Sequence, residues 1–217
     1  ARQLPAKHNL AKIYKPKGLP SQDKWGWQFR GGSKEADVVS LYPEGLLKIY
    51  TQTNQQCWWR SAEADGYSAI DQKKGFTAEI RTQILKTMPP ILAFARKHGG
   101  RGVDLELYDG FGSRYAITIT DTGVYWYEGL VMGSVFLNFE EFTPLAEDLE
   151  NTDTMHTYRL AVRGDRVVQI YRDEKLIGVR RYEYRTPRDA YILFGAGHGT
   201  EALIDYLAYD LTGPYKP

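Results

Sequence analysis

The sequence predicts a single all-β domain, an antiparallel β-sandwich with at most one or two short helices. In the segment from Met155 to Ile177, two alternating runs close on each other through Arg163-Gly164-Asp165, which is typical of a β-hairpin. A second, longer alternation runs from Phe76 to Leu85. One side carries Phe76, Ala78, Ile80, Thr82 and Ile84, and the other carries Thr77, Glu79, Arg81 and Gln83. Further short runs follow between Gly- and Asp-containing turns, and no long stretch has helical periodicity. This spacing favours a sandwich or a jelly roll.

The first part of the chain begins with a segment that has few hydrophobic anchors. Residues 1–35 are rich in Lys, Pro, Gly and Ser, so we expect them to form a wrap or tail that belongs to one sandwich domain over residues 36–217. The strands predicted next lie over 46–51, from 58 onward, over 76–85 and, after Pro89-Pro90, over 91–96.

The second part of the chain contains a meander, the hairpin and the last strands. The strands predicted here, apart from the hairpin, lie over 103–108, 115–120, 124–127, 176–184, 191–194 and 202–211. In the acidic segment 140–153, Thr143-Pro144 followed by Glu147 matches the start of a short helix as well as it matches a loop.

Composition excludes several classes of protein. A formal charge of +1, from 28 basic and 27 acidic residues, argues against a polyanionic nucleic-acid partner. No apolar run approaches the roughly 20 residues that span a bilayer. Cys57 is the single cysteine, so the chain has no internal disulfide and no cysteine-rich zinc site. With 16 Tyr and 5 Trp, some aromatic rings should lie on an open surface.

Four segments, in order, resemble the concanavalin A-like lectin and glucanase superfamily, which includes laminin-G-like modules, family 16 glucanases and family 7 alginate lyases. They are 43–49 (PEGLLKI), 75–81 (GFTAEIR), the hairpin pieces 156–160 (HTYRL) and 170–173 (IYRD), and 204–209 (IDYLAY). The resemblance covers most of the chain from about residue 40 onward. It implies two curved antiparallel sheets and a ligand, commonly a glycan, on the concave face. We therefore expect a secreted or periplasmic protein whose leader is absent from this chain, which opens with ARQLP.

Strand parity places polar side chains in two rows. Glu79, Arg81 and Gln83 share one face of their strand, and Asp104, Glu106 and Tyr108 share one face of theirs. If both rows point into the concave sheet, they form the polar floor of a groove for an oligo- or polysaccharide. The alternative is a solvated convex face with weak ion pairs. The residues predicted to bind the glycan are Trp58, Trp59, Arg60, Glu79, Arg81, Gln83, Glu106, Tyr108 and Trp126.

Catalysis is a separate question from binding. The glucanases of this superfamily carry E-x-D-x-E, with a nucleophile and a general acid on one strand face. Asp104 and Glu106 match the last two acids, but Gly102 occupies the nucleophile's position. We therefore favour a carbohydrate-binding, lectin-like protein, with a divergent glycoside hydrolase as an alternative. A polysaccharide lyase would need a proton-abstracting group, for which the candidates are Tyr108, His98, His156 and His198. A laminin-G-like protein-interaction module is the other alternative and would need an exposed apolar patch.

The resemblance also implies a structural calcium ion on the convex side. In the glucanases an Asp of the terminal strand holds it together with main-chain carbonyls near an early Gly turn, and Asp205 and Gly45 match these places. Calcium prefers such hard oxygen ligands. The alternative is that Asp205 caps a turn or pairs with an arginine.

Overall fold

The structure is a computed structural model, and it describes residues 4–7, 9–24, 27–53, 55–61, 73–87, 102–109, 113–129, 140–181 and 190–217. Within these residues, the chain forms two antiparallel sheets, one α-helical turn, α1 (Glu35–Val38), and one 3-10 turn, η1 (Pro20–Gln22). The predicted all-β sandwich is therefore confirmed. No helix in this part of the chain is long and apolar enough to cross a membrane.

The first sheet has eight strands among the described residues. Its order is β13 (Lys175–Arg181), β12 (Val167–Arg172), β11 (His156–Val162), β6 (Phe76–Lys86), β15 (Glu201–Asp210), β4 (Leu46–Tyr50) and β3 (Val39–Tyr42), and β1 (Lys12–Tyr14) also pairs with β15. The predicted hairpin is its β11–β12 pair, in which Leu160 lies opposite Ile170. The β12–β13 turn places Asp173 and Glu174 at φ 46° and 67°, as a tight two-residue hairpin turn requires.

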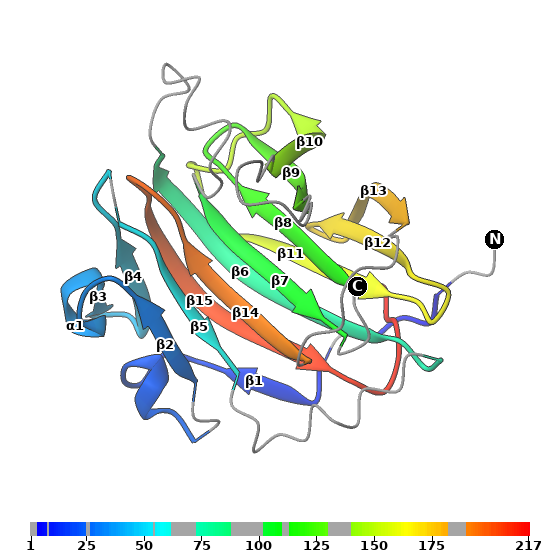
Figure 1. The fold of residues 1–217 in the computed structure, drawn as a ribbon, viewed down its shortest axis with the longest axis horizontal. Helices are drawn as coiled ribbons and strands as arrows, with labels where there is room; N and C mark the ends of the chain where they lie inside the picture. Colours follow the sequence, from blue (N-terminus) through cyan, green and yellow to red (C-terminus); the bar gives the residue numbers. More distant parts are fainter. Residues whose placement is uncertain are drawn as a thin grey trace, which may run out of the picture.

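The second sheet has seven strands among the described residues. Its order is β10 (Glu140–Glu147), β9 (Gly123–Gly129), β8 (Arg114–Ile119), β7 (Val103–Tyr108), β14 (Tyr191–Ala196), β5 (Cys57–Arg60) and β2 (Gln28–Gly31). In Figure 1 the two sheets overlap, and β6, β7, β14 and β15 run diagonally across the view. The two sheets are called below the eight-stranded and the seven-stranded sheet.

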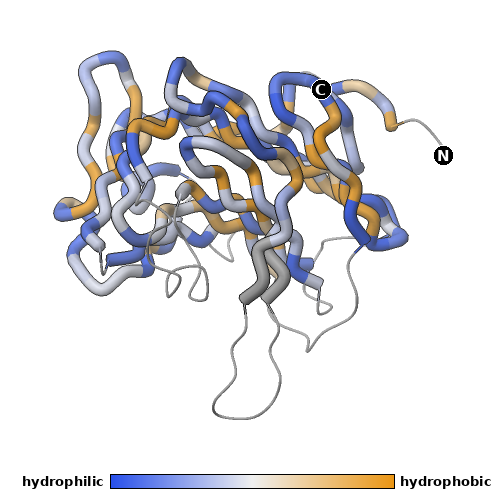
Figure 2. The backbone as a smooth tube through the Cα atoms, turned by 90° about the horizontal axis from the view of Figure 1, so that it is seen from above, coloured by the Kyte–Doolittle hydropathy of each residue, from blue (hydrophilic) through white to orange (hydrophobic). Residues whose placement is uncertain are grey.

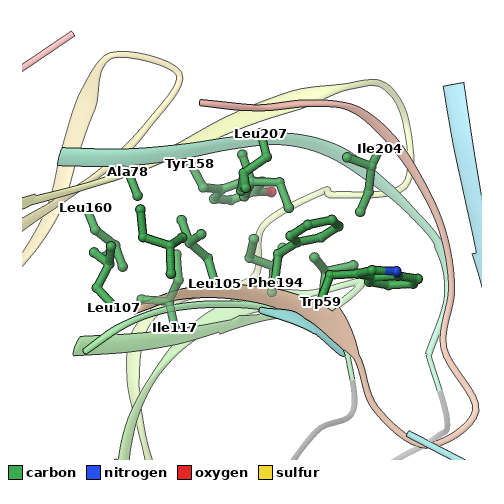
Figure 3. Close-up of a cluster of buried hydrophobic side chains, with 14 of the residues drawn as sticks. Trp59, Ala78, Leu105, Leu107, Ile117, Tyr158, Leu160, Phe194, Ile204 and Leu207 are labelled. Carbon is green, nitrogen blue, oxygen red and sulfur yellow. The ribbon is translucent and has the colours of Figure 1, made fainter. Parts of the chain in front are cut away.

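The core lies between the two sheets. Inward-facing side chains of β6, β11 and β15 meet those of β5, β7, β8 and β14 there, as Figure 3 shows. Ala78 and Ile80 come from the first sheet, and Leu105 and Leu107 from the second, and all four are at most 1% exposed. Figure 2 shows hydrophobic stretches within the strands and hydrophilic residues mainly at the turns. The alternation found in the sequence therefore marks the buried faces of β6 and of the hairpin strands β11 and β12 correctly.

The N-terminal segment contributes a strand to each sheet. Ile13 of β1 lies opposite Ala208 of β15, and Phe29 of β2 lies opposite Trp59 of β5. Between these strands, Trp27 packs edge-on against Phe194 with ring centroids 5.1 Å apart. The segment is thus joined to both layers of the sandwich.

The short helix considered at Thr143-Pro144 is wrong, because these residues lie in strand β10. β10 is the last strand of its sheet, and its register with β9 shifts between Pro144 and Ala146. Proline is tolerated at such a position because an edge strand with a bulge needs fewer ladder hydrogen bonds. The strand predicted over 91–96 and the end of the one predicted over 176–184 lie outside the described residues.

Candidate functional site

The two polar rows do not form one groove. Glu79, Arg81 and Gln83 lie on β6 of the eight-stranded sheet, while Glu106 and Tyr108 lie on β7 of the seven-stranded sheet. Since the even-numbered residues of β6 and the odd-numbered residues of β7 fill the core between the sheets, the two polar rows point outward in opposite directions. The expectation of a shared polar floor is therefore wrong, although the parity within each strand is right.

Two of the predicted ligand-binding tryptophans face the core. Trp59 is fully buried and stacks on Phe194 with ring centroids 5.2 Å apart. Trp126 is 1% exposed and belongs to the same core. Their neighbours Trp58 and Tyr125 are the outward-facing, half-buried residues of these strands. The assignment of Trp59 and Trp126 to the ligand-binding surface is therefore corrected by strand parity.

On the outer face of the eight-stranded sheet, Glu79 belongs to a buried ion pair. Arg159 Nε donates to Glu79 Oε2 at 2.6 Å, and Tyr206 Oη donates to Glu79 Oε1 at 2.7 Å. Arg159 Nη1 also donates to the carbonyl oxygen of Lys7 at 2.9 Å. Both carboxylate oxygens of Glu79 are thus occupied, and the pair holds the N-terminal segment on the sheet.

The other polar residues of β6 are also engaged. Arg81 Nη1 donates to Asp205 Oδ2 at 2.7 Å, and Gln83 Nε2 donates to the carbonyl oxygen of Thr152 at 2.7 Å. Gly45 has a φ of 76° in the turn between β3 and β4. No group of three or more His, Cys, Asp or Glu side chains with metal-binding geometry occurs among the described residues. The side chains do not offer a good fit for calcium, since Asp205 is already paired with Arg81, and the calcium site stays a prediction.

The outer face of the seven-stranded sheet carries a compact group of aromatic and charged side chains, which we call the aromatic–arginine face. Antiparallel pairing aligns its members in rows across β5, β14, β7 and β8. The group consists of Trp58, Arg60, Asp104, Glu106, Tyr108, Arg114, Thr118 and Tyr191.

Gly195 makes room for the indole of Trp58. In the register of the sheet, Gly195 lies between Trp58 and Asp104. A Cβ atom at this position would lie 2.5 Å from Trp58 Cδ1 and 2.2 Å from the carbonyl oxygen of Cys57. Any larger residue at position 195 would therefore push Trp58 away from the surface that it now covers.

Two tyrosines form the centre of one row. The rings of Tyr108 and Tyr191 stack with centroids 4.2 Å apart. The guanidinium of Arg60 lies 4.8 Å from the Tyr191 centroid, and that of Arg114 lies 5.6 Å from the Tyr108 centroid. Each arginine is within cation–π range of its ring, so the four side chains form a continuous layer.

The two carboxylates of β7 have different surroundings. Glu106 accepts two hydrogen bonds from Arg114, from Nη2 at 2.7 Å and from Nε at 3.0 Å. Burial, and after it the nearby charge of Glu106, raise the pKa of Asp104 to about 7, although hydrogen bonds from Thr118 and Trp58 and the charge of Arg114 oppose the rise. The Thr118 bond is 2.5 Å long. One acid is thus held as a paired carboxylate, and the other carries a proton for part of the time at neutral pH.

Gly102 lies at the position that the resemblance assigns to a catalytic nucleophile. Its φ is 149°, and a Cβ atom would lie 2.1 Å from the carbonyl oxygen of Ile119. No side chain fits there without a shift of the backbone, so the backbone itself accounts for the missing carboxylate.

The two described histidines, His156 and His198, are not among the residues of the aromatic–arginine face. His156 lies between two carboxylates, with Nδ1 2.6 Å from Asp173 and Nε2 2.8 Å from Asp153. This is the structural role expected for a residue at the start of the hairpin. His198 contacts the side chain of Gln56, and His98 lies outside the described residues.

Sequence reasoning missed Arg114, Thr118, Tyr191 and Gly195. Arg114 and Tyr191 both lie opposite Tyr108 in the neighbouring strands, and Thr118 lies opposite Asp104. The β7–β8 pairing was available in principle, since the meander joins these strands by a short connection. The β7–β14 pairing joins residues more than 80 positions apart, and no local pattern indicates it.

Comparison with known proteins supports the fold. No protein-family model matches the chain, and no curated protein matches it. A solved carbohydrate esterase from the Shiga toxin-encoding bacteriophage phi24B is 11% identical, with a TM-score of 0.54, over 91% of this chain and 98% of that chain. The binding domain of botulinum neurotoxin DC, solved with rat synaptotagmin II, is 12% identical with a TM-score of 0.54 over 88% of this chain.

A third solved structure is botulinum neurotoxin type C, whose cell entry is described as dependent on interaction with two ganglioside molecules. It is 11% identical, with a TM-score of 0.54, over 88% of this chain. The chain spans 44% of the length of each of these two neurotoxin chains. At such identities the likeness shows the fold alone. The chain is thus an antiparallel β-sandwich protein, and it shares this fold with a carbohydrate esterase and with botulinum neurotoxin domains.

Proposed function

We propose that this protein binds an oligo- or polysaccharide on the aromatic–arginine face. The observation that carries the proposal is the layer formed by Arg60, Tyr191, Tyr108 and Arg114, with Trp58 close by. Sugar rings have apolar faces that stack on aromatic side chains, and their hydroxyls bind planar charged groups. The side chains of this group point away from the core, so packing between the two sheets does not account for them.

The comparisons support the proposal at a coarse level. One solved structure of the same fold is a carbohydrate esterase, and another depends on gangliosides for cell entry. Fold likeness alone does not transfer a function. The residues of the aromatic–arginine face therefore carry the argument, and the neighbours show that the architecture is compatible with carbohydrate ligands.

A specific observation also favours an enzyme as a second candidate. Asp104 and Glu106 lie on the same face of β7, and the pKa of Asp104 is raised to about 7. A carboxyl group that keeps a proton near neutral pH is suited to act as a general acid toward a glycosidic oxygen. Glu106, already paired with Arg114, would hold Asp104 in its protonated form rather than act as a nucleophile. The second candidate is thus a glycoside hydrolase in which Asp104 is the acid.

Binding and catalysis are separated by one set of experiments. The wild-type protein and Trp58→Ala are screened on a glycan array, and each positive oligosaccharide is then titrated by calorimetry. Incubation of the same oligosaccharides with the protein is followed by reducing-end assay and by absorbance of unsaturated sugars. Saturable binding that Trp58→Ala weakens, with no product formed, supports the binding protein. Product formation that Asp104→Asn abolishes supports the hydrolase.

The matched control is Arg81→Gln, on the opposite outer face, which should bind as the wild type does. If no neutral, acidic or sulfated glycan binds, or if Trp58→Ala and Arg81→Gln bind as well as each other, the proposed function is wrong.

A further inference from the structure

Two arginines on the aromatic–arginine face each lie over a tyrosine ring, but only one of them is paired with a carboxylate. Arg114 is paired with Glu106 through two hydrogen bonds. Arg60 has no hydrogen bond or ion pair from its side chain to any described residue, and its Nε atom is shielded from solvent without a partner. Its guanidinium lies over the ring of Tyr191, 4.8 Å from the centroid. A buried donor on a fixed cation costs free energy when it lacks a partner.

The described charges of this face leave a positive excess around Arg60. Arg30, Arg60 and Arg114 provide three positive charges on the outer face of the seven-stranded sheet, and Asp104 and Glu106 provide at most two negative ones. Glu106 is neutralised by Arg114. Arg30 is exposed and donates to the Gln28 amide oxygen at 3.2 Å. Arg60 is thus a positioned cation whose counter-ion is not among the described side chains.

We propose that the glycan recognised by this face is an acidic one, and that Arg60 binds the carboxylate of a uronic or sialic acid unit stacked near Tyr191 and Tyr108. The inference rests on the proposed function and names its ligand class. A guanidinium is planar and matches the two oxygens of a carboxylate, which is the geometry that Arg114 and Glu106 already show on this face.

A carboxylate fits this face better than a phosphate does. A phosphate monoester carries about two negative charges, and Asp104 and Glu106 on β7, one strand beyond β14, would repel it more than a single charge. A sulfate ester carries one charge and can also bind a guanidinium through two oxygens, so the sulfated ligand in the test separates it from a carboxylate. The contact with the Tyr191 ring positions the guanidinium of Arg60 before the ligand arrives, so less entropy is lost on binding.

The test compares ligands that differ only in the charged group. Tetragalacturonate is titrated beside its carboxyl-reduced counterpart, sialyllactose beside its neutral methyl ester, and a sulfated galactan oligosaccharide is included, all by calorimetry on the full chain. The wild type should bind at least one carboxylated ligand about 10- to 100-fold more tightly than its neutral counterpart, the range that a charge-assisted hydrogen bond provides. Arg60→Gln should lose this preference and keep the affinity for the neutral counterpart.

The controls show whether a loss is specific to Arg60. Arg60→Lys should recover part of the preference, since it restores the charge without the planar group. Arg81→Gln, on the opposite face, should keep all of it. Circular dichroism and the melting temperature of each variant establish that it is folded, and the ratio between two ligands on one variant is insensitive to partial unfolding.

The outcomes separate the two proposals. Equal affinity for carboxylated and neutral ligands, with a loss in Trp58→Ala, overturns the acidic-glycan inference and leaves the proposed function standing. Preference for the sulfated ligand over every carboxylated one also overturns the inference. A carboxylate preference that persists in Arg60→Gln assigns the charge recognition to another residue and overturns the role of Arg60. No binding to these ligands by a protein that binds a neutral glycan on the array overturns the acidic-glycan inference alone, and no binding on the array either overturns both proposals.

Discussion

Glu79 and Glu106 occupy outward positions on β6 and β7, and their carboxylates point away from each other on opposite faces of the sandwich. Each has an arginine partner, Arg159 for Glu79 at 2.6 Å and Arg114 for Glu106 at 2.7 Å. The surroundings decide what each pair does. Arg159 also donates to main-chain carbonyl oxygens of both terminal segments, whereas Glu106 and Arg114 lie beside stacked rings.

Replacement of Glu79 by Gln should destabilise the protein without changing glycan binding. The side chains of Glu79 and Arg159 are 7% and 3% exposed, so the change leaves a buried guanidinium without its charge partner. Loss of one partner from such a pair costs about 3–5 kcal/mol of unfolding free energy. Urea unfolding measures the cost. Arg81→Gln, which breaks a more exposed pair, should cost less than about 1 kcal/mol, and equal costs would contradict the assignment.

Replacement of the two adjacent tryptophans should give opposite phenotypes. Trp59→Ala removes a fully buried ring and should cost about 3–5 kcal/mol of unfolding free energy. Trp58→Ala removes a half-buried outward ring. It should change stability much less, while it weakens glycan binding about 10-fold or more, as the loss of a central aromatic contact does. Denaturant unfolding and calorimetric titration of both variants provide the comparison, and a Trp58→Ala protein with wild-type affinity would contradict the prediction.

Asp104 should make the stability of the wild type depend on pH. Its pKa in the folded protein, about 7, lies above its ordinary value of 3.8, so the folded state holds a proton that the unfolded state releases. The stabilisation is complete below about pH 4 and is lost as the pH rises toward 7, with a slope of at most about 1.4 kcal/mol per pH unit. Asp104→Asn has no such proton. The unfolding free energy of the wild type should therefore fall relative to that of Asp104→Asn between pH 4 and pH 7. Urea titrations of both proteins at each pH measure this difference. A difference that stays constant with pH would show that Asp104 ionises normally.

Asp205 distinguishes an ion pair from a calcium site. In the presence of a chelator, Asp205→Asn should change the unfolding free energy by less than about 1 kcal/mol, because its partner Arg81 is 43% exposed. Should the predicted calcium ion bind here, millimolar calcium would raise the melting temperature of the wild type and not that of Asp205→Asn. A calcium effect that is equal in both proteins would place the ion elsewhere.

The predictable part of this fold is the part that local pattern determines. The alternation from Phe76 to Leu85 marks which residues of β6 are buried, and the Asp173-Glu174 turn marks the β12–β13 connection. Sheet membership is a different matter. Nothing in the sequence of β6 or β7 indicates that they belong to different layers, because pairing partners such as Tyr108 and Tyr191 are far apart in the chain.

The candidate site was predicted in part for the same reason. Trp58, Arg60, Glu106 and Tyr108 lie together on one face, whereas Glu79, Arg81 and Gln83 lie on the other. For the pair Trp58-Trp59, the sequence gives no basis for deciding which ring faces the core, because two adjacent large rings fit either face. The structure decides it through Gly195, whose missing side chain leaves space for Trp58 alone.

Both ends of the described chain are fixed to the sheet that lies away from the aromatic–arginine face. Ala6 pairs with Lys216, and Arg159 Nη1 donates to the carbonyl oxygens of Lys7 and Tyr215. An anchor attached at either end, whether a sensor surface or a fused reporter, would therefore leave the stacked tyrosines and Arg60 turned toward the solution. Several copies tethered in this way would present their arginines to one polymer chain at once.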